Sequence, residues 1–278
     1  MAQPFLYNYD SVLITGILFL LIIAMNELSF RIGRFVQHST DAEMKTLTGS
    51  IQGSILGLLA LLLGFTFSMS MQRFDGRSEA LIAEANAIGT ASLRVQLLPE
   101  EFHAEANALL GRYVDMRIGI GKIDLSHAAQ RKKYNQDIAA LQSDLWALAV
   151  AATNADPRPV TSGAFVNSLN EMIDSQGKRN ALQQMRVPEV VLWLLFIVFV
   201  ASGGMLGYSS GLSGTRVVAP TVMVSFLIAM IVFIIIDLDR PKRGLIQVDQ
   251  SSLLALQGAV PMPPSGSGMG ERTGVVSY

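Results

Sequence analysis

The sequence contains no cysteine and few charged residues. Only 15% of its 278 residues are Asp, Glu, Lys or Arg, whereas half are hydrophobic. The absence of Cys excludes disulfide frameworks and thiolate metal sites. The formal net charge is −1, which argues against a nucleic-acid-binding surface. The mean hydropathy of +0.40 is too high for an ordinary soluble domain.

Four long apolar runs stand out instead. Runs of about 18 or more apolar residues are typical of membrane-spanning helices. They cover residues 11–30, 51–71, 189–208 and 217–236. The first run has no Lys or Arg before it and no small-residue cleavage site after it, so we do not interpret it as a signal peptide. The sequence therefore predicts an integral membrane protein.

The stretch between the second and third runs predicts a helical domain. Its apolar residues recur at helical spacing on both sides of Pro99, and no segment alternates as a half-buried strand does. We therefore predict an all-α protein with four transmembrane helices and a cytoplasmic helical domain inserted between helices 2 and 3. Residues 1–71 hold the first two spans, 72–188 the domain, 189–237 the last two spans, and 238–278 a cytoplasmic tail. The end of this tail is rich in Pro, Gly and Ser and is expected to be disordered.

Basic residues near the span ends predict the orientation. With four spans, both termini and the helical domain lie on one side of the membrane. That side carries more Lys and Arg than the other, which places it in the cytoplasm. Its basic residues are Arg73, Arg77, Lys178, Arg179, Arg186, Arg240, Lys242 and Arg243, against Arg31, Arg34, Lys45 and Arg216 on the opposite side.

The second span carries its small residues on one side of a helical wheel. The same rhythm continues past the membrane to Val95, which predicts one long helix that packs against other helices along its length. Thr66 and Ser70 fall toward the other side, where we expect them to face lipid and to bond a carbonyl one turn back. The small-residue stripe consists of Ser50, Gly53, Gly57, Ala60 and Gly64.

Two interpretations of this stripe remain open. Small residues let helix backbones approach closely, so the stripe is explained by packing alone. Alternatively, it lines a pore that narrows at a hydrophobic gate near the cytoplasmic mouth. The candidate pore-lining and gate residues are Gly57, Gly64, Phe67, Ser68, Met71, Phe74 and Asp75.

The third span has a similar pattern, in which Gly203, Gly207 and Gly211 stand four residues apart. This spacing predicts helix packing.

Charged residues follow the fourth span directly. Asp237, Asp239 and Arg240 either anchor the helix end at the membrane surface, or one Asp pairs with Arg73 or Arg77 and joins the fourth span to the long helix.

No group of residues points to catalysis. Glu27 lies late in the first span, and we expect it to form an ion pair with Arg31 one turn later. The histidines His38, His103 and His127 are scattered, so they predict no metal site. We expect neither an enzyme nor a cofactor.

Several stretches together resemble the bacterial membrane proteins called bestrophin-like. These include "GLLALLLGFTFSMSMQRFDGR", "EANAIGTASLR" and "IDLDRPKRGLIQV", and the resemblance covers most of residues 51–250. By analogy with bestrophins, the resemblance implies a pentameric anion channel in the bacterial inner membrane. Its second transmembrane helix would line the neck. No acidic run resembles the bestrophin calcium clasp, so calcium gating is not expected.

We therefore expect a homo-oligomeric ion channel, because four helices from one chain are too few to enclose a wide aqueous path. Its partners would be membrane lipid, further copies of the chain and a small inorganic ion, with no nucleic acid. The alternative is a non-conducting membrane scaffold or sensor whose cytoplasmic helical domain binds a partner.

Overall fold

The computed structural model describes residues 9–119, 128–216, 218–240 and 244–258. Every element within these ranges is helical, which confirms that the protein is all-α. Four helices are long and apolar enough to cross a membrane, as expected. The predicted disordered end of the tail falls on residues 259–278, outside the described residues, as do Lys242 and Arg243. The chain forms two compact units, Met1–Arg77 with Gln183–Val248 and Ser78–Leu182 with Asp249–Tyr278.

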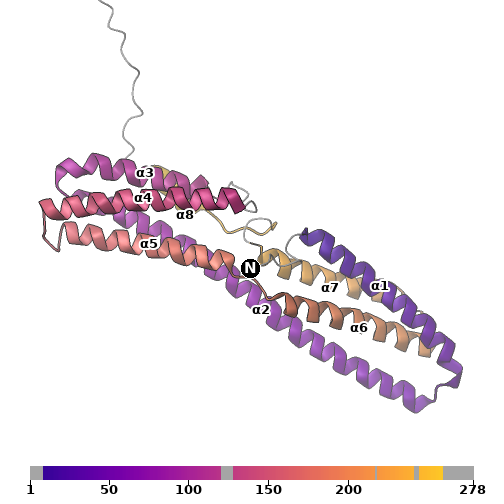
Figure 1. Ribbon diagram of the computed structural model, residues 1–278. Helices are drawn as coiled ribbons and strands as arrows, with labels where there is room; N and C mark the ends of the chain where they lie inside the picture. The colour runs from indigo at the N-terminus through magenta and orange to yellow at the C-terminus, as the bar shows by residue number, and fades with distance from the viewer. Residues whose placement is uncertain (1–8, 120–127, 217, 241–243, 259–278) are drawn as a thin grey trace, which may run out of the picture. The chain divides into compact units, whose positions relative to one another are not determined.

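The first unit contains the four apolar helices (Figure 1). All four contribute to one hydrophobic core, which includes Leu18, Leu59, Phe199 and Val232. Burying such side chains gives the unit a packed interior, while other apolar side chains remain on its surface, as expected for a protein surrounded by lipid. The helices are α1 (Ser11–Val36), the first part of α2 (Ala42–Arg94), α6 (Glu189–Ser213) and α7 (Val218–Leu238).

Local signals set the ends of these helices. Asp10 caps α1, because its carboxylate accepts a hydrogen bond from the Val12 amide at 3.1 Å. Pro188 immediately precedes α6, and Gly214 ends it with φ of 70°, a left-handed conformation that favours glycine. A short turn, η2 (Gln37–Ser39), follows α1.

The second unit is a helical bundle with its own core. Pro99 separates α2 from α3, as predicted, and short 3₁₀ turns lie on both sides of it. Tyr113, Ile138 and Phe165 are fully or almost fully buried in this unit. The elements are the last part of α2, η3 (Val95–Leu97), η4 (Glu100–Phe102), α3 (His103–Gly119), α4 (Ala128–Ala155), α5 (Ser162–Gln184), α8 (Ser251–Leu254) and η6 (Ala255–Gly258).

Residues near the C-terminus belong to this second unit. Leu253 is fully buried, and Leu256 lies close to Gly89 of α2. The Gln257 amide donates a hydrogen bond to the Asp115 carboxylate at 3.0 Å. The first part of the tail is therefore held by packing and hydrogen bonding against the bundle.

Candidate functional site

Within the first unit, α2 presents three different sides. The first is buried against the other helices and includes Leu59, Thr66 and Ser70. The second is exposed and covered by bulky apolar side chains, such as those of Leu61 and Phe65. The third is also exposed but carries glycines. Successive residues of an α-helix are about 100° apart, so Phe65 and Phe67 lie on opposite flanks of the buried side.

The glycine-bearing side contains the predicted pore residues. A side chain added at Gly57 or Gly64 would meet no atom within 4 Å, apart from the helix's own backbone and chain neighbours. Phe67 and Met71 are each 40% exposed. This side of α2 is therefore not covered by the chain's own described helices. Of the remaining candidates, Ser68 and Asp75 are exposed and Phe74 is partly buried.

The expectation that Thr66 and Ser70 face lipid is wrong. Their side chains are 2% and 0% exposed and point into the unit. The Thr66 hydroxyl donates to the carbonyl of Leu62 at 2.8 Å, as expected for a hydroxyl in a membrane helix. That bond satisfies the hydroxyl within α2 and allows its burial beside apolar side chains. The side of α2 that packs within the chain is therefore the one opposite the predicted small-residue stripe.

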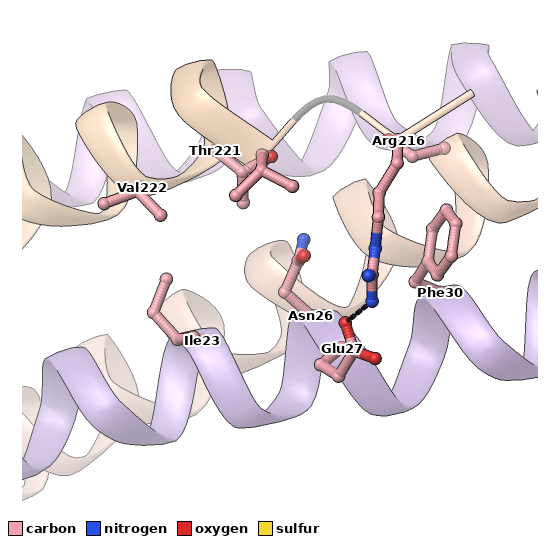
Figure 2. A pocket seen from close by; sticks show the side chains of 9 residues that line it. Ile23, Asn26, Glu27, Phe30, Arg216, Thr221 and Val222 are labelled. Carbon is pink, nitrogen blue, oxygen red and sulfur yellow. Dashed lines mark hydrogen bonds and ion pairs between the residues drawn. The ribbon is translucent and has the colours of Figure 1, made fainter.

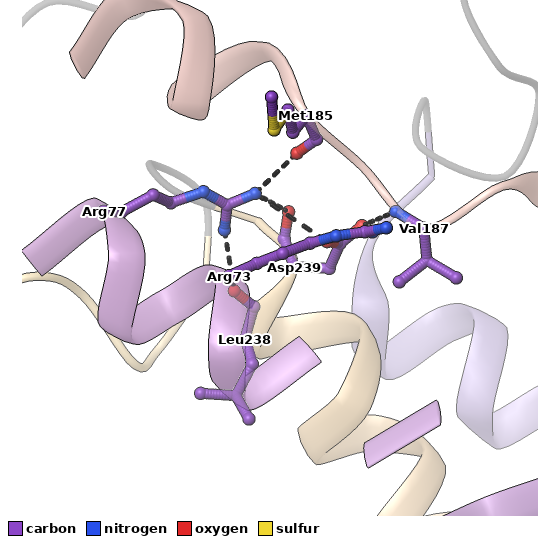
Figure 3. A network of polar contacts seen from close by, with 6 residues as sticks. All are labelled: Arg73, Arg77, Met185, Val187, Leu238 and Asp239. Carbon is purple, nitrogen blue, oxygen red and sulfur yellow. Dashed lines mark hydrogen bonds and ion pairs between the residues drawn. The ribbon is translucent and has the colours of Figure 1, made fainter. Parts of the chain in front are cut away.

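Asp239, directly after α7, lies beside both arginines of α2 (Figure 3). Its Oδ1 is 3.4 Å from Arg73 Nη1 and 3.7 Å from Arg77 Nη2. Its Oδ2 accepts a hydrogen bond from the Val187 amide at 2.8 Å. Asp239 is buried, so these contacts compensate for the cost of removing its charge from water.

Arg77 binds main-chain carbonyls as well. It donates to Leu238 O at 3.0 Å and to Met185 O at 2.7 Å (Figure 3). Carbonyl groups at the end of α7 have no partner within the helix, and a guanidinium supplies donors in a fixed planar arrangement. Arg77 therefore connects α2 to the end of α7 and to the segment that precedes α6.

Asp237, in the last turn of α7, and Arg240, which follows the helix, complete the charged cluster at the end of the fourth span. Asp237 Oδ2 accepts a hydrogen bond from the Ile246 amide at 2.8 Å. A side chain at Gly244 would come within 2.7 Å of the Asp237 carbonyl oxygen, so the returning chain needs glycine there. Arg240 is buried, with 6% of its surface exposed. These contacts hold the segment that contains Gly244 and Ile246 against the end of α7.

The glycines of α6 lie directly against α1. A side chain at Gly207 would overlap the Asn26 carbonyl, with 2.8 Å to its carbon. A side chain at Gly203 would come within 2.7 Å of Ile22, and one at Gly211 within 2.8 Å of the Arg34 amide nitrogen. The Asn26 amide also donates to Gly203 O at 3.0 Å. These three glycines therefore permit close backbone contact between the two helices.

A cavity of about 210 Å³ lies between α1 and the start of α7 (Figure 2). Glu27 is its acidic residue, and it pairs with Arg31 at 2.9 Å and also with Arg216. The Arg216 guanidinium lies 5.0 Å from the centre of the Phe30 ring, within cation–π range. Sequence reasoning missed Arg216 as a partner. The available signal was that it is the one basic residue between the third and fourth spans.

The second unit contains a buried ionic cluster that sequence reasoning also missed. Glu84 of α2 accepts hydrogen bonds from Arg117 at 2.9 Å and from Arg179 at 2.6 Å. Arg117 also donates to the Tyr134 hydroxyl at 3.3 Å. Burial would lower the pKa of Arg117, but the Glu84 carboxylate more than offsets this and raises it. Burial raises the pKa of Tyr113 and of Tyr134, because their ionised forms would lose hydration.

Among the described residues, no three His, Cys, Asp or Glu side chains gather as a metal site would require. The features that the described part of the chain offers for function are therefore the exposed glycine-bearing side of α2, the charged cluster after α7, and the Arg216 cavity.

Comparisons with known proteins identify a family. A family model described as Bestrophin-like domain matches residues 19–253. One similar solved structure is a bacterial bestrophin homologue from Klebsiella pneumoniae that carries a tryptophan-to-alanine mutation. It has a TM-score of 0.62 and 17% identity, over 90% of this chain and 99% of that chain. Another, with a tyrosine-to-alanine mutation, has a TM-score of 0.61 and 17% identity, over 87% and 98% of the two chains. A comparison with curated proteins finds no match.

Proposed function

Because this chain belongs to the Bestrophin-like family, we propose that it is a homo-oligomeric ion channel whose path is lined by α2. The observation that carries this proposal is the exposed, glycine-bearing side of α2 around Gly57 and Gly64. One chain leaves this side uncovered, whereas further copies arranged around a symmetry axis would enclose it.

The composition of this side supports a pore wall more than a lipid-facing surface. The exposed residues of α1 include Leu13, Ile17 and Leu20, as expected for contact with acyl chains. The glycine-bearing side of α2 instead has Gly57, Gly64 and the hydroxyl of Ser68. Small and hydroxyl-bearing residues leave room for ions and water, which bulky apolar side chains would fill.

The gate in this proposal consists of Phe67, Met71 and Phe74. Phe67 and Met71 are exposed on the same side as the glycines, and Phe74 follows them toward the end of the first unit. A ring of such side chains narrows a path and resists wetting, so it closes the path without a charged barrier. Asp75 and Arg77 lie just beyond the gate in sequence.

Arg73, Arg77 and Asp239 have a supporting role in this mechanism. Their contacts hold this part of α2 against the end of α7, so the gate side chains have a fixed support within each subunit. We assign them to positioning and not to ion contact, because Arg77 and Asp239 are buried.

The remaining parts of the proposal follow from the family and from the distribution of basic residues. The permeant ions are anions, the oligomer is a pentamer, and the protein lies in the bacterial inner membrane with both termini in the cytoplasm. The alternative is a non-conducting scaffold or sensor whose second unit binds a partner.

A matched pair of variants tests the proposal. The full chain is reconstituted in liposomes, and chloride and potassium fluxes are measured separately. Phe67→Ala widens the proposed gate and should raise chloride flux several-fold. Phe65→Ala removes a phenyl ring two positions earlier, on the exposed side of α2 that carries bulky apolar side chains. This variant should leave chloride flux unchanged.

The scaffold alternative predicts a different outcome. It predicts silent liposomes for the unmodified chain and for both variants, under gradients of several ions. Equal changes from Phe65→Ala and Phe67→Ala would contradict the assignment of the pore side. Larger potassium than chloride flux would leave a channel but overturn its anion selectivity.

A further inference from the structure

Three arginines and one carboxylate line the same groove at the end of α1. An open groove of about 600 Å³ is lined by Glu27, Phe30, Arg31, Arg34, Phe35 and Arg216. Three guanidinium groups against one carboxylate leave this groove with a net charge of +2 (3 − 1). Glu27 pairs with Arg31 and with Arg216, so a single acidic residue holds two cations close together.

The guanidinium groups are available to a ligand. The side chains of Arg31 and Arg216 are 75% and 55% exposed, so their pairing with Glu27 does not enclose them. Arg34 uses Nη1 to bind the Gly214 carbonyl at 2.8 Å. An arginine has five N–H donors, so each of these side chains retains donors for an anion.

The surroundings of the groove are apolar and lie at the edge of a membrane span. Phe35, on the same groove, is 88% exposed. The cavity of Figure 2 shares Glu27, Phe30 and Arg216 with the groove and continues to the exposed Val218 and Val222 of α7. A basic opening therefore leads onto an apolar wall near the ends of two helices that are apolar enough to cross a membrane, which is where a lipid headgroup would be bound.

We propose that this groove binds an anionic phospholipid. Arg31 and Arg216 bind the phosphate oxygens, because a guanidinium matches phosphate with two parallel hydrogen bonds. Glu27 keeps both side chains in place, and the apolar wall contacts the acyl chain. Basic pockets between membrane helices are a known form of headgroup recognition, and the net charge of +2 favours an anionic over a zwitterionic headgroup.

Lipid selectivity tests this site directly. The full chain, purified in detergent, is titrated with short-chain phosphatidylglycerol or phosphatidylcholine, and bound lipid is counted by native mass spectrometry. The unmodified chain should bind phosphatidylglycerol about tenfold more tightly than phosphatidylcholine, because both carry a phosphate but the positive groove repels the choline cation of phosphatidylcholine. Inorganic phosphate at the same concentration should not displace the lipid, because it makes no contact with the apolar wall.

The control is another basic residue, Lys45, which lies at the same end of the spans but outside the groove. The double variant Arg31→Gln and Arg216→Gln should lose the preference for phosphatidylglycerol, whereas Lys45→Gln should keep it. Unfolding midpoints show whether each variant is folded, and single Arg31→Gln provides a milder version of the test. Equal binding of the two lipids, or a double variant that keeps the preference, would overturn the proposal. Displacement of the lipid by inorganic phosphate would assign the groove to a soluble anion instead.

Discussion

Two stripes of glycine in the first unit, one on α6 and one on α2, have similar spacing and different surroundings. On α6, Gly203, Gly207 and Gly211 lie so close to α1 that a methyl group would strike main-chain or side-chain atoms. On α2, a methyl group at Gly57 or Gly64 would strike nothing within the chain. The first stripe packs against α1 within the subunit. The second is left open, which is why we assign it to a path shared between subunits.

The largest expected effect comes from Gly207→Ala. Its new methyl group meets the main chain of Asn26, which cannot rotate away as a side chain does. We expect the free energy of unfolding to fall by about 1–3 kcal/mol, the usual cost of overpacking a close contact. Chemical unfolding of the full chain in detergent, followed by circular dichroism, measures it. Unchanged stability would mean that α1 and α6 are not held this closely.

Gly204→Ala should have a smaller effect. Its nearest neighbours are the side chains of Met25 and Ser29, each 3.2 Å from the position of the new methyl group. These side chains can shift by a few tenths of an ångström, and alanine favours the helix by about 1 kcal/mol over glycine. We therefore expect a change within about 1 kcal/mol in the same unfolding experiment. A loss as large as that of Gly207→Ala would show that side-chain packing here is as rigid as the backbone.

Gly57→Ala should have the smallest effect on chain stability and is the matched control for both. Because the methyl group meets no neighbour, only helix propensity acts, and stability should rise by at most about 1 kcal/mol. The same variant should nevertheless alter ion flux in liposomes, since it adds volume to the proposed pore wall. A variant that loses stability without any change in flux would place this stripe at a packing contact instead.

The comparison of the two stripes also shows what the sequence could predict. Long apolar runs and Pro99 were enough to place the four spans and the end of α2, because both signals act locally. A helical wheel did not tell which side of α2 is buried, because lipid and a helical core are both apolar. Thr66 and Ser70 were therefore assigned to the wrong surroundings.

Charged residues illustrate the same limit. The position of Asp239 directly after a span was compatible with a membrane-surface anchor or with a partner on α2, and the structure places it beside Arg73 and Arg77. The cluster of Glu84, Arg117 and Arg179 gave no comparable signal, because its members come from three helices. Arg117 and Arg179 lie 33 and 95 residues after Glu84, and the sequence around each of them does not indicate that they pair. Only the tertiary arrangement brings these side chains together.

The contacts of Arg77 set an order of events during synthesis. Its carbonyl acceptor Met185 lies 108 residues later in the chain, and Leu238 lies 161 residues later. When α2 is first made, these acceptors do not yet exist, and a guanidinium destined for burial must remain hydrated in the meantime. The helices of the first unit therefore complete their packing only after the fourth span has been synthesised. A chain truncated before Leu238 would be exposed to misassembly at this point.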